Sequence, residues 1–144
     1  MRYFSTLVTL LLALVISASV QAHSAHIGKL EIHHPWIAPT KAGVTSGSVI
    51  TWIENNGDEA DRIISASTPI AATALVQGEQ GQNTIDLPAK KTVKFAPDGA
   101  RIILQGLTKT LDEYDTFKLD LVFEHAGKLT LEVHVDDKAS PAKK

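Results

Sequence analysis

The sequence predicts an all-β domain, a Greek-key β-sandwich or a barrel, and three observations indicate this fold class. Apolar and polar residues alternate with period two through most of the chain after residue 28, which is typical of strands with one buried face. Polar or Gly/Pro-containing segments interrupt the alternation at regular spacing and leave about eight short strands. The chain has no apolar run at helical spacing that is long enough to predict a helix.

Residues 1–22 precede this pattern and predict a cleaved secretory signal peptide. Arg2 supplies a positive charge, and the apolar run of ten residues that follows is too short to span a bilayer. Small residues then lead to a cleavage site after Ala22. Cleavage after Ala18 is the alternative, and it would leave only a short segment between the apolar run and the cleavage site. Cleavage after Ala22 makes His23 the new N-terminus. We therefore expect an exported, periplasmic protein without a membrane anchor.

The strands follow one another in short steps. In the first strand Leu30 and Ile32 share one face, and Pro35 either ends the strand or places it at a sheet edge. The last two strands form the clearest hairpin, in which Leu119 and Leu131 lie on apolar faces. The strands are expected over 29–36, 48–55, 62–68, 70–77, parts of 84–97, 100–107, 116–124 and 128–135. Loops, polar turns and prolines separate them at 37–47, 55–61, Pro69, 78–83, 97–99 and 125–128.

The composition predicts one domain and excludes several kinds of partner. Residues 23–136 are expected to form the sandwich behind a His-bearing leader, and the charged tail 137–144 is expected to be disordered. There is no cysteine, so no disulfide framework exists, and the single methionine is Met1, which leaves with the signal peptide. The formal net charge is -2 with no basic block, so nucleic acid is not an expected partner.

Three segments resemble a known family, the periplasmic copper chaperones called PCu(A)C. They are "LEIHHPWIAPT", "GSVITWIENNGDEADRIISASTPIA" and the long stretch from "LPAKKTVKF" to "KLTLEV". The resemblance covers about residues 29–135, and its middle block is the most specific part. It implies a cupredoxin-like Greek-key β-sandwich and a role in delivering copper, chiefly to the binuclear site of cytochrome oxidase.

The copper ligands that the resemblance would imply are not found in this chain. The family's usual site has one His, a Met soon after it, and a His-x-Met further along. The first His position falls at Val76, the Met-bearing hairpin is shortened to "GEQGQN", and the His-x-Met positions fall at Arg101 and Ile103. A thioether-rich Cu(I) site needs sulfur, and the chain after cleavage has none.

The histidines predict a different copper site. Four of the six histidines lie within residues 23–34. After cleavage, His23 would offer its α-amine and its ring Nδ1 to one metal, and a second His would add a third nitrogen. This histidine brace suits Cu(II), which favours square-planar or tetragonal nitrogen and oxygen ligands.

Several residues are candidates for completing the brace. In the first strand, His34 has the same parity as the buried Leu30 and Ile32, whereas the parity of His33 points its side chain outward. His134 in the last strand also points outward. The first and last strands of such sandwiches often lie side by side, which would bring these histidines together. The expected metal ligands are, in order, His23, His34, His33 and His134, with His26 next and His125 last; Asp136, Asp137 or Glu31 could add an oxygen.

These observations favour a copper chaperone or carrier, with copper as cofactor and a copper-accepting membrane enzyme or another copper carrier as partner. The alternative is a binding or scaffold module that has kept the fold and lost the metal, because fold alone does not fix function. A copper oxidase is a third hypothesis. We expect no enzyme, because the sequence shows neither a catalytic triad nor a paired carboxylate set.

Overall fold

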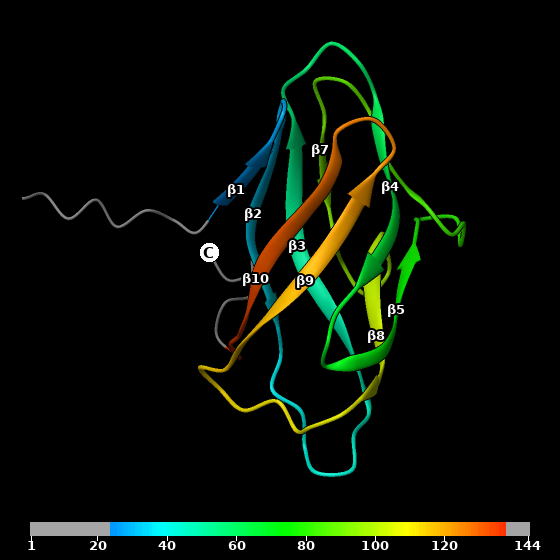
Figure 1. Cartoon of the computed structure of the whole chain (residues 1–144). Helices are drawn as coiled ribbons and strands as arrows, with labels where there is room; N and C mark the ends of the chain where they lie inside the picture. Colours follow the sequence, from blue (N-terminus) through cyan, green and yellow to red (C-terminus); the bar gives the residue numbers. More distant parts are fainter. Residues whose placement is uncertain (1–23, 138–144) are drawn as a thin grey trace, which may run out of the picture.

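The computed structural model describes residues 24–137, and within that range the chain is all-β without a helix (Figure 1). Nothing in this range could cross a membrane as a long apolar helix. The strands are β1 Ser24–Ile27, β2 Leu30–Ile37, β3 Ser46–Asn55, β4 Asp61–Ser67, β5 Ala71–Gln77, β6 Ile85–Leu87, β7 Thr92–Lys94, β8 Arg101–Leu107, β9 Thr116–Phe123 and β10 Gly127–Val135.

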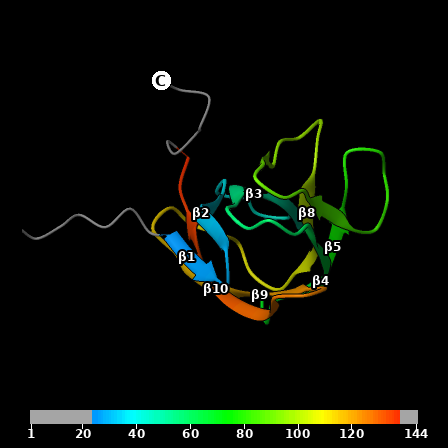
Figure 2. The ribbon, with the colours of Figure 1, turned by 90° about the horizontal axis from the view of Figure 1, so that it is seen from above.

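The strands form one sheet that closes on itself. Its order is β1-β2-β10-β9-β4-β5-β8-β3-β7, with β6 paired to β4, and a further pairing of β2 with β3 closes the ring. The view from above in Figure 2 shows the strands arranged around this closed ring. All the strand pairs are antiparallel except β2 with β10, which is parallel.

Alternating residues of the strands fill the interior of the ring. Along β9 the burial alternates between buried apolar residues and more exposed polar ones, as the sequence pattern predicts. The largest fully buried side chains come from both halves of the ring and include Ile32, Ile53, Ile102, Leu119 and Phe123. The all-β prediction and the predicted strand positions are thus confirmed.

The prediction for Pro35 is wrong, because this residue lies inside β2 with strands paired on both edges. The register between β2 and β3 shifts between His33 and Trp36, and His34 has a φ of 38°, in the left-handed region. Proline cannot donate to a strand ladder, so it is tolerated within a sheet at such an irregularity. The bulge also changes the direction in which the residues after His33 point.

The segment before β2 was expected to be a leader, and the structure shows a strand there. In β1, Ser24 pairs with His33 and His26 pairs with Glu31. β3 occupies one edge of β2, so β1 and β10 share the other edge, β1 along the first half and β10 at the end. The described start of the chain therefore lies beside the histidines of β2.

Candidate functional site

His34 and His134 lie next to each other on neighbouring strands. Their rings are nearly parallel, at 10°, with centroids 6.0 Å apart. The parallel pairing of β2 with β10 places His134 opposite Trp36, two residues beyond His34. The side chain of His134 is 26% exposed, and its Nε2 lies 3.6 Å from Glu132 Oε1. Two imidazoles thus lie side by side at the edge where β1, β2 and β10 meet.

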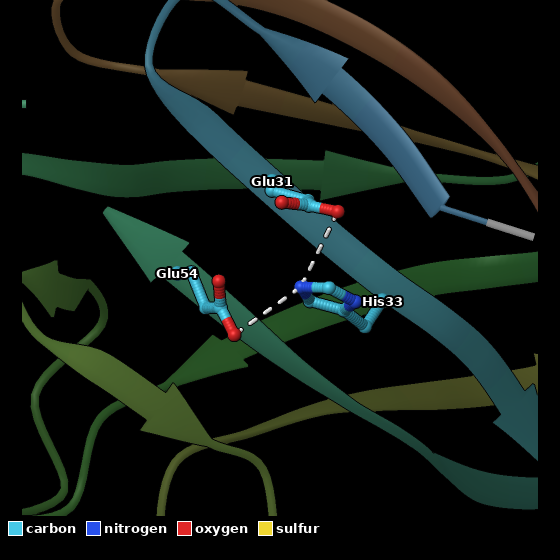
Figure 3. A group of neighbouring side chains, drawn as sticks. All are labelled: Glu31, His33 and Glu54. Carbon is cyan, nitrogen blue, oxygen red and sulfur yellow. Dashed lines mark ion pairs between the residues drawn. The ribbon is translucent and has the colours of Figure 1, made fainter. Parts of the chain in front are cut away.

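His33 faces the other way and joins a carboxylate group on the outer face of β2 and β3. Its Nε2 lies 3.7 Å from Glu31 Oε1 and 3.5 Å from Glu54 Oε1, as the dashed lines in Figure 3 show. These three ligand atoms lie within 4.8 Å of one another. His26 lies at the margin, with its Nε2 3.8 Å from the same Glu31 oxygen and its side chain 63% exposed.

Strand register explains why these residues meet. Glu31 pairs with Glu54, and His33 pairs with Trp52, in the antiparallel ladder of β2 and β3. Residues two apart in a strand share a face, so Glu31 and His33 lie on the same side as Glu54. The rings of His33 and Trp52 stack with centroids 5.1 Å apart and planes at 8°. The hydroxyl of Thr51 donates to the His33 carbonyl.

Four of the five predicted ligands therefore divide between two places, and the fifth lies outside the described residues. His34 and His134 come together, whereas His33 and His26 belong to the Glu31–Glu54 group. His23 precedes the first described residue, Ser24. Glu54 as a neighbour of His33 and the stacking of Trp52 on His33 were not predicted, although the outward parity of both residues next to the buried Ile53 was available. Only the register of β2 with β3 shows what they face.

The other residues considered at the sequence level lie elsewhere. His125 is on the turn between β9 and β10, with its side chain 65% exposed, and its Nε2 lies 3.7 Å from Glu124. The carboxylates of Asp136 and Asp137 gather with Glu113 into a purely acidic group. Exposed acidic groups of this kind are common without a metal.

Val76, Arg101 and Ile103 stand at the positions where the resemblance to PCu(A)C chaperones implies copper ligands. Val76 is buried in the core, and Arg101 and Ile103 lie on β8 beside β5. The Arg101 guanidinium donates to Gln77 Oε1 at 2.8 Å and to the Pro97 carbonyl at 2.7 Å. A permanently charged guanidinium has no acceptor atom and repels a cation. This region is therefore unsuited to copper, as the sequence indicates.

Comparisons with known proteins identify relatives of this fold. Residues 30–135 match the model of the LpqE-like family, described as "Putative lipoprotein LpqE-like". The apo PCuAC domain from PmoF1 is similar at 29% identity, with a TM-score of 0.76, over 79% of this chain and 98% of that one. A search of curated protein sequences finds no match.

Two further solved structures were determined with copper. The copper-bound PCuAC domain from PmoF2 is 27% identical, with a TM-score of 0.74, over 79% of this chain and 97% of that one. The Cu(I) form of DR1885 from Deinococcus radiodurans shares the fold at 17% identity and a TM-score of 0.66, over 84% of this chain and 85% of that one. The expected cupredoxin-like sandwich is confirmed by these likenesses.

Proposed function

Because this chain belongs to the LpqE-like family and has the fold of PCuAC domains, we propose that it is an exported copper-binding protein. Its site is a histidine brace made by His23, His34 and His134. The single observation that supports this most is the pairing of the His34 and His134 rings beside β1, the strand that directly follows His23.

The spacing of the two rings suits a shared metal. A metal–nitrogen bond is about 2.0–2.1 Å, so two nitrogens on opposite sides of one ion stand about 4 Å apart. Each nitrogen lies on the rim of its ring, about 1 Å from the centre, so the two ring centres then lie about 6 Å apart. The centroids of His34 and His134 are 6.0 Å apart. The two rings are stacked, so their side chains have to rotate before both nitrogens bind one ion.

The position of β1 supports His23 as the third member. Ser24 pairs with His33, the neighbour of His34, and consecutive Cα atoms are about 3.8 Å apart. Ser24, the residue that follows His23 in the sequence, therefore lies beside the strand that carries His34. An N-terminal His adds its α-amine and Nδ1, which completes three or four nitrogen ligands without sulfur. That ligand set favours Cu(II) over Cu(I).

Copper carriage between exported proteins is the role that fits this site. The family description as a lipoprotein supports export, and the predicted signal peptide over 1–22 supports a periplasmic location. The recipient is a copper-accepting membrane enzyme or another copper carrier. We propose no enzymatic activity. A scaffold module that has lost its metal is the alternative, favoured by the absence of the family's usual ligands at Val76, Arg101 and Ile103.

Copper titration of the chain that begins at His23 tests this proposal. We expect one Cu(II) per chain, and at least tenfold weaker binding when one extra residue precedes His23, because the α-amine is then lost as a ligand. His125→Gln serves as the control, since this exposed histidine lies on the β9–β10 turn. Equal affinity with and without the extra residue would refute the brace. Absence of stoichiometric copper would favour the scaffold alternative.

A further inference from the structure

We propose that Glu31, His33 and Glu54 form a second metal site, for a divalent cation that prefers tetrahedral coordination by nitrogen and oxygen, with Zn²⁺ as the best fit. This site is separate from the proposed copper brace, because His33 turns toward β3 whereas His34 turns toward β10. The inference does not depend on copper binding. Figure 3 shows the three side chains converging on one point above the sheet.

The distances match the edges of a tetrahedron around an ion. The His33 Nε2 lies 3.7 Å from Glu31 Oε1 and 3.5 Å from Glu54 Oε1. These separations are longer than the usual N–H···O distance of about 2.7–3.2 Å. Ligand atoms bound at about 2.0–2.2 Å to one tetrahedral Zn²⁺ stand about 3.3–3.6 Å from each other. The two distances from His33 Nε2 are therefore close to those between ligands of one ion, and the ligand atoms of the three residues all lie within 4.8 Å of one another.

The His33 Nε2 is an unsatisfied polar atom. It is buried and has no hydrogen-bond partner among the residues that the structure describes, although its side chain as a whole is 20% exposed. Buried polar atoms of side chains nearly always have a partner, because an unsatisfied one destabilises the fold. A cation held with the two carboxylates would satisfy this nitrogen.

The charges around His33 also favour a cation. Glu31 and Glu54 lie directly opposite each other in the β2–β3 ladder, and like charges in that position destabilise a sheet. The cationic or titratable neighbours are His26 on β1, paired with Glu31, and Lys94 on β7, paired with Trp52. A divalent ion would balance both carboxylates at once.

The strands hold the three ligands in place before the metal arrives. Trp52 stacks on the His33 ring and fixes its plane, and Thr51 anchors the His33 backbone. Sites built on strands and supported by neighbouring side chains are more precise than sites on loops. His26 is the fourth ligand in this arrangement, because its Nε2 lies 3.8 Å from the Glu31 oxygen and its exposed side chain can rotate toward the ion.

Zinc titration of the metal-free chain, with native mass spectrometry for stoichiometry, tests the site. We expect one Zn²⁺ per chain and at least tenfold weaker binding after Glu54→Gln or Glu31→Gln, which remove a charge and keep the shape. Glu59→Gln is the matched control, because Glu59 is exposed on the turn after β3. Circular dichroism confirms that the variants are folded.

Two results would overturn the proposal. One is Zn²⁺ binding by Glu54→Gln and Glu31→Gln that equals binding by the unaltered chain. The other is loss of zinc in His134→Gln with retention in Glu54→Gln, which would place the zinc at the copper site. The copper titration separates the two proposals, since Glu54→Gln should leave copper affinity unchanged whether or not the brace exists.

Discussion

The rings of His34 and His134 lie parallel with centroids 6.0 Å apart, although they belong to the second and the last strand of the described chain. The parallel pairing of β2 with β10 brings them together, and it begins only at Trp36. The bulge around Pro35 makes this change of partner possible, since β1 covers the first half of the same edge. The candidate copper site thus lies where three strands meet.

Removal of either ring tests whether the two share one metal. We expect His34→Gln and His134→Gln each to weaken Cu(II) binding at least tenfold, about 1.4 kcal/mol. The double variant should lose less binding free energy than the sum of the losses in the two single variants, because both residues bind the same ion. Chelator competition measures the affinities, and electron paramagnetic resonance reports the number of nitrogen ligands.

His125→Gln controls for the loss of a histidine elsewhere on the protein, at an exposed turn. If the loss of binding free energy in the double variant equals the sum of the two single losses, a shared ion is contradicted, because the effects of substitutions at independent sites are additive.

Copper binding should also depend on pH. Ligating imidazoles and amines must be unprotonated, and an ordinary imidazole protonates near pH 6.5, an α-amine near 7.7–8.0. Occupancy should therefore be high at pH 8 and fall steadily toward pH 5. Equilibrium dialysis at fixed copper concentration measures it, with circular dichroism showing that the metal-free protein stays folded. Full occupancy at pH 4 would rule out a nitrogen-only site.

The alternation of apolar and polar residues along the chain was sufficient to predict most of the fold. Alternation along β9 and β10 correctly places Leu119 and Leu131 in the core, since strand parity is a property of consecutive residues. β1 was missed because its four residues, "SAHI", form too short an alternation to predict a strand. Pro35 was misjudged because a bulge depends on the partner strands and not on the residue alone.

The candidate sites could be predicted only in part, because they depend on register between distant strands. The side-by-side position of the first predicted strand and the last was expected, and it brings His34 to His134. The meeting of His33 with Glu54 depends on the β2–β3 register, which a single sequence does not reveal. Glu54 was therefore not recognised as a partner.

Asn55 should contribute strongly to stability. It is 3% exposed, and its amide donates to the carbonyls of Glu59 and Leu87, both at 2.9 Å, while its Oδ1 accepts from the Gly57 amide at 3.0 Å. Asn55→Ala leaves these groups without a partner, so we expect a loss of about 1–3 kcal/mol in the free energy of unfolding. Urea denaturation measures it.

Asn56→Ala is the matched control, because the neighbouring Asn56 is exposed. Equal stability of the two variants would show that the Asn55 hydrogen bonds do not stabilise the turn.

The stability of the hairpin formed by β9 and β10 should depend on the ionisation of Asp120. The Thr130 hydroxyl, followed by the Lys128 ammonium, lowers the pKa of Asp120 below its ordinary 3.8. A lowered folded-state pKa means that this stabilisation is present above about pH 3.8 and is lost as the pH falls through the folded value. Thr130→Val should therefore raise the pKa of Asp120 toward 3.8, as measured by NMR titration. An unchanged pKa would contradict the role of Thr130.

Trp52 tests whether the proposed zinc site depends on a fixed imidazole. Its ring stacks on His33 at 5.1 Å but offers no metal ligand. Aromatic pairs contribute about 0.5–1.5 kcal/mol, so Trp52→Ala should weaken Zn²⁺ binding about two- to twelvefold, since 1.4 kcal/mol is tenfold. Trp52→Phe keeps a flat ring under His33 and should restore most of the affinity.

Copper affinity provides the internal control for both Trp52 variants, because His34 contacts His134 on β10 and does not take part in the Trp52–His33 stack. If Trp52→Ala and Trp52→Phe bind Zn²⁺ equally well, stacking does not orient the ligand. If both variants lose copper as well as zinc, the substitutions have disturbed β2 as a whole, and the ring has no specific positioning role. A zinc-specific loss that phenylalanine reverses is the result that a preorganised His33 requires.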